Sequence, residues 1–281
     1  MSTSPRIAIS LGASFMGYAT HAGFMAALHA RGLRPVAVAG SSAGAITGGL
    51  YAAGLSQQAI RDCVLSPRLF LSFASRTKWI WHHLLDVFTR RRPGFFNASG
   101  AIPHFESLVG RRGIESLTHP RLMIALSDLE KHETIYATRG PLARAMAASS
   151  CVPTLFAPLE FEGRACTDGG VVHEAPVDPW FQDDDIDHII LHRIIQQPTR
   201  PSLLLPGRLL GTIGDSHQCL SRQILADRID RARHSGKKLT IVSTEHPRPS
   251  PFFPGRLKET YALGEATARA WLDSGGEGLT P

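Results

Sequence analysis

Residues 35–54 read PVAVAGSSAGAITGGLYAAG, and this stretch decides the expected fold. An apolar strand at 35–39 runs into the turn Gly40-Ser41-Ser42-Ala43-Gly44, and a helix of small residues follows until Gly54. Upstream, residues 6–10 form another apolar run, and residues 22–30 carry apolar positions at helical spacing. Strand, helix, strand, turn and helix within about fifty residues are typical of a parallel α/β sheet.

Later parts of the chain continue the same alternation. Apolar and β-branched runs that favour buried strands lie at 122–126, 133–137, 163–167, 188–192 and 239–243. Helices are expected on both sides of the last of these runs. We therefore expect an α/β three-layer sandwich with a mostly parallel central sheet.

Length and composition favour one large core. The chain has 281 residues, of which 43% are hydrophobic and 19% charged, so we expect a single domain over 1–281. Residues 55–110 lack a strand pattern, which predicts a helical insertion that acts as a lid. The proline-containing stretch 196–214 is expected to be irregular, and the glycine-rich end 274–281 is expected to be a flexible tail.

Charge and hydropathy restrict the partners. A net charge of +6 and thirteen histidines favour anionic partners, but no recognition motif accompanies the basic runs, so nucleic acid is not expected. No stretch reaches the ~18 consecutive apolar residues of a membrane-spanning helix, so membrane contact is expected to be peripheral. The first residues lack the features of a secretory signal, which predicts a cytoplasmic protein.

No cofactor or metal is expected. The four cysteines are far apart and contain no Cys-x-x-Cys pair, so reduced, buried thiols are predicted at Cys63, Cys151, Cys166 and Cys219. The adjacent pair His82-His83 would diverge on a helix, so it does not suggest a ligand pair.

The turn at 40–44 matches the Gly-x-Ser-x-Gly pattern of a nucleophile elbow, in which a serine sits on a sharp bend between strand and helix. Gly40 and Gly44 fit this interpretation because a Cβ at either position would collide with the adjoining strand or helix. The helix that begins at Ala43 directs its positive end at developing negative charge, so the Ala43 amide is a candidate oxyanion donor to a reaction at Ser42. A glycine–serine turn that binds phosphate, or no ligand, is the alternative.

A serine hydroxyl needs a base, and Asp168-Gly169-Gly170 follows directly after the expected strand at 163–167. Gly169 and Gly170 let the backbone turn sharply and let another segment approach the carboxylate. Asp-Gly-Gly is also an ordinary turn sequence, so Asp168 gains its importance from the combination with Ser42.

Several separated segments resemble the patatin-like phospholipases, which are lipid acyl hydrolases with a Ser-Asp dyad. The resemblance runs from about Arg6 to His192 and rests on the segments 10–12, 21–23, 39–54, 140–142, 148–153 and 168–172, with Pro176. It implies the patatin-like fold, with Ser42 as the nucleophile and Asp168 as its base. It also implies an oxyanion hole made by Gly12, Ala13, Ser14 and Ala43.

The oxyanion loop departs from the family pattern. The family usually reads Gly-Gly-Gly-x-Arg/Lys-Gly, whereas this chain reads Gly12-Ala13-Ser14-Phe15-Met16-Gly17 and has no basic residue there. Backbone amides of Ala13 and Ser14 can still serve as donors. Because a missing donor costs about 100- to 1,000-fold in rate, a non-catalytic lipid-binding protein with a degraded oxyanion loop is an alternative.

The resemblance implies acyl transfer from fatty-acyl esters of phospholipids or lysophospholipids. Asp168 takes the Ser42 proton as Oγ attacks the ester, and water then hydrolyses the acyl-enzyme. We expect Asp168 to be desolvated, because burial raises the pKa of a carboxyl group and makes it a better base. The other alternative is a Ser-His-Asp esterase, whose histidine would be chosen from His173, His188, His192, His217 and His246.

Residues 76–96 alternate aromatic and basic groups and include Arg90-Arg91-Arg92. Such a segment suits an interfacial helix on anionic lipid. A helix packed over the active site with a solvated basic end is the competing interpretation, and a lid over a lipid site would satisfy both.

Overall fold

The computed structural model describes residues 5–74, 94–172, 174–197, 205–247 and 256–276. Ten strands are assigned there: β1 Ile7–Leu11, β2 Ala37–Ser41, β3 Gly94–Phe96, β4 Arg121–Asp128, β5 Glu133–Ala137, β6 Thr154–Phe156, β7 Leu159–Phe161, β8 Arg164–Asp168, β9 His188–Gln197 and β10 Lys238–Pro247. The helices are α1 Tyr18–Ala30, α2 Ala43–Ala52, α3 Gln57–Leu65, α4 Pro67–Ala74, α6 Ala101–Val109, α7 Leu142–Ala148, α8 Leu205–His234 and α9 Leu257–Asp273. Short 3-10 turns are η1 Ala98–Gly100, η2 Ile114–Ser116, η3 Gly169–Val171 and η4 Asp178–Trp180.

The central sheet has eight strands, with β5 paired to β4 beside the path β10-β9-β1-β2-β4-β8-β7. The five strands from β10 to β4 are parallel, while β5, β8 and β7 join antiparallel. The expected α/β class with a mostly parallel sheet is confirmed. The strands expected at 133–137 and 163–167 are present, and they form its antiparallel part.

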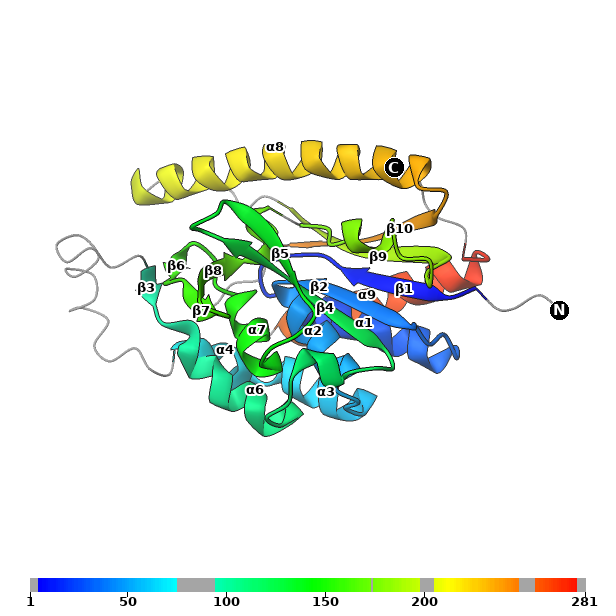
Figure 1. The fold of residues 1–281 in the computed structure, drawn as a ribbon, viewed down its shortest axis with the longest axis horizontal. Coiled ribbons are helices and arrows are strands. Elements are labelled where there is room, and N and C mark those ends of the chain that lie inside the picture. Colours follow the sequence, from blue (N-terminus) through cyan, green and yellow to red (C-terminus); the bar gives the residue numbers. More distant parts are fainter. Residues whose placement is uncertain (1–4, 75–93, 173, 198–204, 248–255, 277–281) are drawn as a thin grey trace.

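Helices cover both faces of this sheet (Figure 1). Alternation along each strand explains the two layers, because successive side chains point to opposite faces. On β1, Ile9 and Leu11 join the larger core under α1, α2 and α9, whereas Ala8 joins a smaller core with Leu225 of α8. Figure 1 shows α8 along one side of the sheet and α1 and α2 on the other.

The expected insertion at 55–110 contains α3, α4 and α6, together with the short strand β3, which sequence patterns did not indicate. Ile60, Phe73 and Phe105 from its described parts belong to the larger core. The segment is therefore built into the domain on both sides of residues 75–93. Most of the interfacial segment predicted at 76–96, within the expected lid at 55–110, lies outside the described residues, as does most of the tail predicted at 274–281.

The expectation of irregular structure at 196–214 was wrong for 196–197 and 205–214, because β9 continues to Gln197 and α8 begins at Leu205. Residues 198–204 lie outside the described residues. Pro206 falls in the first turn of α8, where a missing N–H leaves no helical hydrogen bond unmade. The prediction for the cysteines held for Cys63, Cys151 and Cys166, which are free and buried, but Cys219 is exposed on α8.

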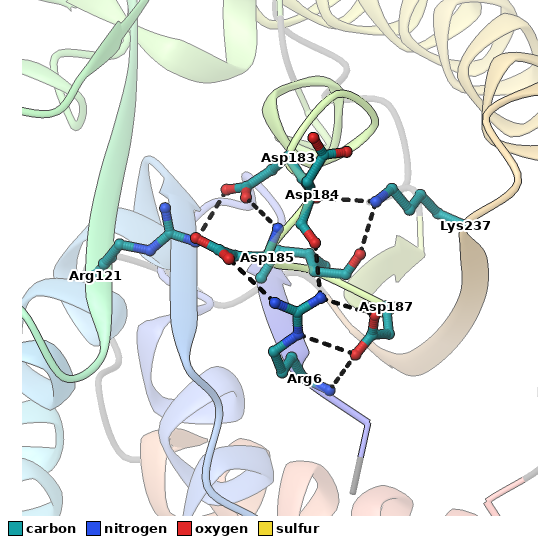
Figure 2. Close-up of polar contacts among 8 residues, drawn as sticks. Arg6, Arg121, Asp183, Asp184, Asp185, Asp187 and Lys237 are labelled. Atoms are coloured by element: carbon teal, nitrogen blue, oxygen red, sulfur yellow. Dashed lines mark hydrogen bonds and ion pairs between the residues drawn. The ribbon is translucent and has the colours of Figure 1, made fainter. Parts of the chain in front are cut away.

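Ion pairs and hydrogen bonds join the segments that lead into β1, β9 and β10, as Figure 2 shows. Ser42 follows the last residue of β2 and so lies at the opposite end of the parallel strands. Arg6, just before β1, donates to Asp185 Oδ1 at 3.0 Å, to the Asp184 carbonyl at 2.7 Å and to the Asp187 carboxylate. Lys237, just before β10, donates to carbonyls of the same acidic loop, residues 183–187. These contacts lower the pKa of Asp187, chiefly through the hydrogen bonds from Arg6.

Among the described residues, no helix combines the length and the apolar character needed to cross a membrane.

Candidate active site

Ser42 lies at the sharp bend between β2 and α2. Its backbone has φ 53° and ψ −117°, a conformation that is rare for a residue with a side chain and that is typical of strained functional turns. A Cβ added at Gly44 would lie 2.1 Å from the Leu11 carbonyl oxygen, and one at Gly40 would lie 2.4 Å from the Gly44 carbonyl oxygen. The structure thus explains the glycines of the pattern by close backbone approach of β1, β2 and α2.

The sheet register brings Asp168 to this bend. Ser41 pairs with Ala125, and Asp168, the last residue of β8, pairs with the next residue, Leu126, on the same edge of β4. The opposite edge of β4 is occupied by β5 at both positions. Gly169 allows this close approach, because a Cβ there would lie 2.2 Å from the Ala125 carbonyl oxygen.

Ser42 Oγ donates a hydrogen bond to Asp168 Oδ2 at 2.6 Å. Both side chains are buried, with 7% of Ser42 and 5% of Asp168 exposed. The other carboxylate oxygen of Asp168 accepts from the Gly170 amide at 2.7 Å, which fixes the carboxylate plane. A charge-assisted O–H···O bond of this length is strong, and it aligns the hydroxyl with a group that can accept its proton.

Ser149 and Ser150, directly after α7, form hydrogen bonds with the backbone of Ser42 at the bend between β2 and α2. The Ser42 amide donates to Ser149 Oγ at 2.9 Å, and Ser149 Oγ donates in turn to the Ala125 carbonyl at 2.7 Å. Ser150 Oγ donates to the Met146 carbonyl at 2.9 Å. This serine pair is indicated in the sequence only by the family resemblance, because the contact between Ser149 and Ser42 joins residues that are 107 positions apart.

Two of the three amides in the expected oxyanion loop, residues 12–14, already donate hydrogen bonds within the protein. The Gly12 amide donates to the His192 carbonyl at 3.0 Å, and the Ala13 amide donates to the Glu174 carbonyl at 2.7 Å. Neither N–H can therefore reach an oxyanion in this arrangement, which corrects the expectation for Gly12 and Ala13. Ser14 lines the pocket beside Ser42, and Ala43 begins α2, where its amide has no acceptor within the helix.

Ser42 opens onto a pocket with mainly apolar walls. Phe70 and Phe73 of α4, Ile46 of α2, and Leu155 and Phe156 of β6 form much of its lining. Met16, in place of the family's basic residue, also lines the pocket and is 6% exposed. The site therefore offers a hydroxyl and a carboxylate beneath apolar surface, an environment that suits the acyl part of an ester.

The downstream histidines have mostly other partners. His188 and His192 share the His-x-x-x-His spacing, but on a strand they lie apart, and they bond Thr240 and Thr244 on β10 at 2.8 Å and 2.9 Å. His246 bonds Thr20 at 3.1 Å. Two histidines remain as candidates for the base of a Ser-His-Asp triad. His173 lies outside the described residues, and the side chain of His217 is not described.

In the part of the chain that the structure describes, no three His, Cys, Asp or Glu side chains come together as a metal-binding group.

An elbow serine bonded to a buried aspartate, at the carboxyl end of parallel strands in a three-layer fold, defines an α/β protein with a Ser-Asp site. The model of the family "Patatin-like phospholipase" matches residues 9–180. The chain belongs to the patatin-like phospholipase family, which confirms the family expected from the sequence.

Curated relatives support this membership. Two uncharacterized NTE family proteins, from Mycobacterium tuberculosis and Mycobacterium bovis, are each 36% identical over 180 residues, which cover 63% of this chain and 46% of the relative. The chain thus matches slightly less than half the length of these relatives.

A solved structure shares the fold. VipD from Legionella pneumophila aligns with a TM-score of 0.58 and 14% identity, and the alignment covers 97% of this chain and 67% of VipD. At that identity the likeness supports the architecture alone.

Proposed function

We propose that the chain is a serine acyl hydrolase that cleaves fatty-acyl esters of phospholipids or lysophospholipids. One observation carries this proposal: the 2.6 Å hydrogen bond from Ser42 Oγ to the buried Asp168 carboxylate, at an elbow that opens onto an apolar pocket. Membership in a phospholipase family supports the same reaction class.

The proposed reaction proceeds by acyl transfer. Asp168 accepts the hydroxyl proton while Ser42 Oγ attacks the ester carbonyl, and the tetrahedral intermediate then expels the alcohol, which takes that proton from Asp168. Water next attacks the acyl-enzyme, with Asp168 again accepting a proton and returning it to Ser42. These steps use groups of the chain itself and require no cofactor.

The proposed oxyanion donors are the amides of Ser14 and Ala43. Preorganised donors at this position stabilise negative charge that exists only in the intermediate and the transition states that flank it. The positive end of α2 contributes in the same direction. Met16 supplies no charge, so the proposed site depends on backbone amides alone.

The lipid class follows from the surroundings of Ser42. An apolar pocket fits an acyl chain better than a polar acyl donor, and the net charge of +6 favours approach to an anionic lipid surface. We propose peripheral contact with such a surface in the cytoplasm.

A non-catalytic lipid-binding role is the second candidate. The observation in its favour is that the Gly12 and Ala13 amides already have acceptors and that Met16 replaces a cation. A Ser-His-Asp esterase with His173 or His217 is the remaining alternative.

The test is turnover of a fluorescent lysophospholipid by the purified chain and by Ser42→Ala, Asp168→Asn and Ser41→Ala. Ser41 is the matched control, because it is buried beside Ser42 and its Oγ has no hydrogen-bond partner among the described residues. The proposal expects activity in the wild type and Ser41→Ala, and loss in the other two folded variants. Lipid binding without turnover in the wild type would favour the second candidate, and equal loss in two further variants, His173→Gln or His217→Gln, would favour the triad.

A further inference from the structure

Two buried histidines meet behind the oxyanion loop. His21 of α1 and His192 of β9 approach through their Nδ1 atoms at 2.8 Å, and both side chains are fully buried. His21 Nε2 lies 2.8 Å from the Gly12 carbonyl oxygen, and His192 Nε2 lies 2.9 Å from Thr244 Oγ1. A series of hydrogen bonds through Gly12, His21, His192 and Thr244 therefore links the loop to β10, the edge strand of the sheet.

The proton positions follow from the carbonyl at one end. A carbonyl oxygen only accepts, so His21 Nε2 carries a proton and donates to Gly12. In a neutral imidazole the other nitrogen is then an acceptor, so His192 Nδ1 must carry the proton between the rings. His192 Nε2 is left as an acceptor for the Thr244 hydroxyl. Both nitrogens of each imidazole ring therefore have a hydrogen-bond partner.

Burial keeps the two rings neutral. Desolvation lowers the pKa of His21 to about 4 and that of His192 well below its usual range. The ring of Phe24 stacks on His192 with centroids 3.8 Å apart and planes 8° from parallel, which fixes the imidazole plane.

The pair holds one peptide group of the loop. The Gly12 carbonyl and the Ala13 amide belong to the same peptide, and it is bonded at both ends, by His21 at 2.8 Å and by the Glu174 carbonyl at 2.7 Å. The preceding Gly12 amide donates to the backbone of His192 itself at 3.0 Å. The next amide along the chain is that of Ser14, a residue that lines the same pocket as Ser42.

We propose that the buried His21–His192 pair positions the oxyanion loop, by holding the Gly12–Ala13 peptide so that the Ser14 amide is presented to the reacting ester. His21 and His192 are positioning residues that do not touch the substrate. This inference rests on the proposed hydrolase function.

Three variants separate this role from general stability. His21→Leu removes the donor to Gly12 at similar volume, whereas His21→Gln keeps an N–H near the Nε2 position. His188→Leu is the matched control, because His188 is a buried histidine at the start of β9 that bonds Thr240 at 2.8 Å.

Nuclear magnetic resonance and kinetics give independent readouts. Imidazole nitrogen shifts of the wild type should show the Nε2–H tautomer for His21 and the Nδ1–H tautomer for His192. Hydrogen exchange of the Ala13 amide should be at least about 10-fold faster in His21→Leu than in His188→Leu. The kcat of His21→Leu should fall about 10-fold or more with KM within about threefold, and His21→Gln should recover part of it.

Opposite tautomers in the wild type would overturn the inference, even if the variants fail to fold. Equal Ala13 exchange in His21→Leu and His188→Leu, or an unchanged kcat in folded His21→Leu, would overturn it as well. If the wild type shows no turnover but Ala13 exchange is faster in His21→Leu, the proposed hydrolase is refuted. The same result would still support the conclusion that the His21–His192 pair holds the Gly12–Ala13 peptide.

Discussion

Ser149 Oγ accepts a hydrogen bond from the backbone amide of Ser42 at 2.9 Å and donates one to the Ala125 carbonyl at 2.7 Å. A fully buried hydroxyl thus satisfies the amide of Ser42, the residue after β2, and a carbonyl of β4, at the point where the chain bends into α2. The elbow is therefore supported from outside as well as by its own glycines.

Ser149→Ala should destabilise the fold. It leaves the buried Ser42 N–H without its acceptor and removes a hydrogen bond to the Ala125 carbonyl, which costs about 1–3 kcal/mol in free energy of unfolding. Ser150→Ala should cost less, because Ser150 bonds chiefly to the carbonyl of Met146, four residues before it. Urea unfolding of both variants measures the difference, and equal stability of Ser149→Ala and wild type would contradict this reading of the elbow.

Gly44→Ala should be among the most damaging single substitutions in the chain. The added Cβ would lie 2.1 Å from the Leu11 carbonyl oxygen, so β1 or α2 must shift, at a cost of about 3 kcal/mol. Gly48→Ala in the same helix is the control, since its Cβ would meet a Val38 methyl group at 3.0 Å, which can give way. A small change in the urea midpoint of Gly44→Ala would show that the backbones are not in close contact.

As the pH is lowered, the free energy of unfolding should begin to fall at a higher pH than the one at which carboxyl groups titrate. Burial lowers the folded-state pKa of His21 and His188 to about 4 and that of His192 further, while unfolded histidine titrates near ~6.5. The unfolded state therefore binds protons first. The stabilisation is complete above ~6.5 and is lost as pH falls toward 4, by up to about 1.4 kcal/mol per pH unit for each histidine.

Groups around the histidines leave this sign unchanged. His246 lowers the pKa of His21 and of His192, and Lys238 lowers the pKa of His188, so both neighbours disfavour a positive charge on these rings. The carboxyl groups with lowered pKa, Asp128 and Asp187, lose their contribution only below ~4. Chemical denaturation at several pH values measures the effect, and a flat free energy of unfolding between pH 7 and 5 would be inconsistent with neutral buried histidines.

Sequence patterns predicted the parts of this protein that local chemistry determines. Strand, turn and helix around Ser42 are encoded within twenty consecutive residues, and Asp168-Gly169-Gly170 is a local turn after a strand. β3, β6 and β7 were not predicted, because a strand of three residues is too short to show a pattern. β3 and β6 also depend on pairing with each other across distant parts of the chain, whereas β7 pairs with the adjacent β8.

The supporting contacts of the site are also non-local. His21 and His192 are 171 residues apart, and Ser42 and Ser149 are 107 apart, so no spacing in the sequence links them. The state of the Gly12 and Ala13 amides depends on the carbonyls of His192 and Glu174, which only the folded sheet brings close. Sequence alone therefore indicated the loop but not which of its amides are in use.

Covalent labelling with a fluorophosphonate, followed by intact-mass and peptide mass spectrometry, tests the Ser42–Asp168 pair most directly. The wild type and Ser41→Ala should each gain one adduct on Ser42 at similar rates, and Ser42→Ala should gain none. Asp168→Asn keeps the shape of the carboxylate but not its basicity, so it should react about 100-fold more slowly. An adduct on another residue, or equal labelling rates for Asp168→Asn and wild type, would contradict the dyad.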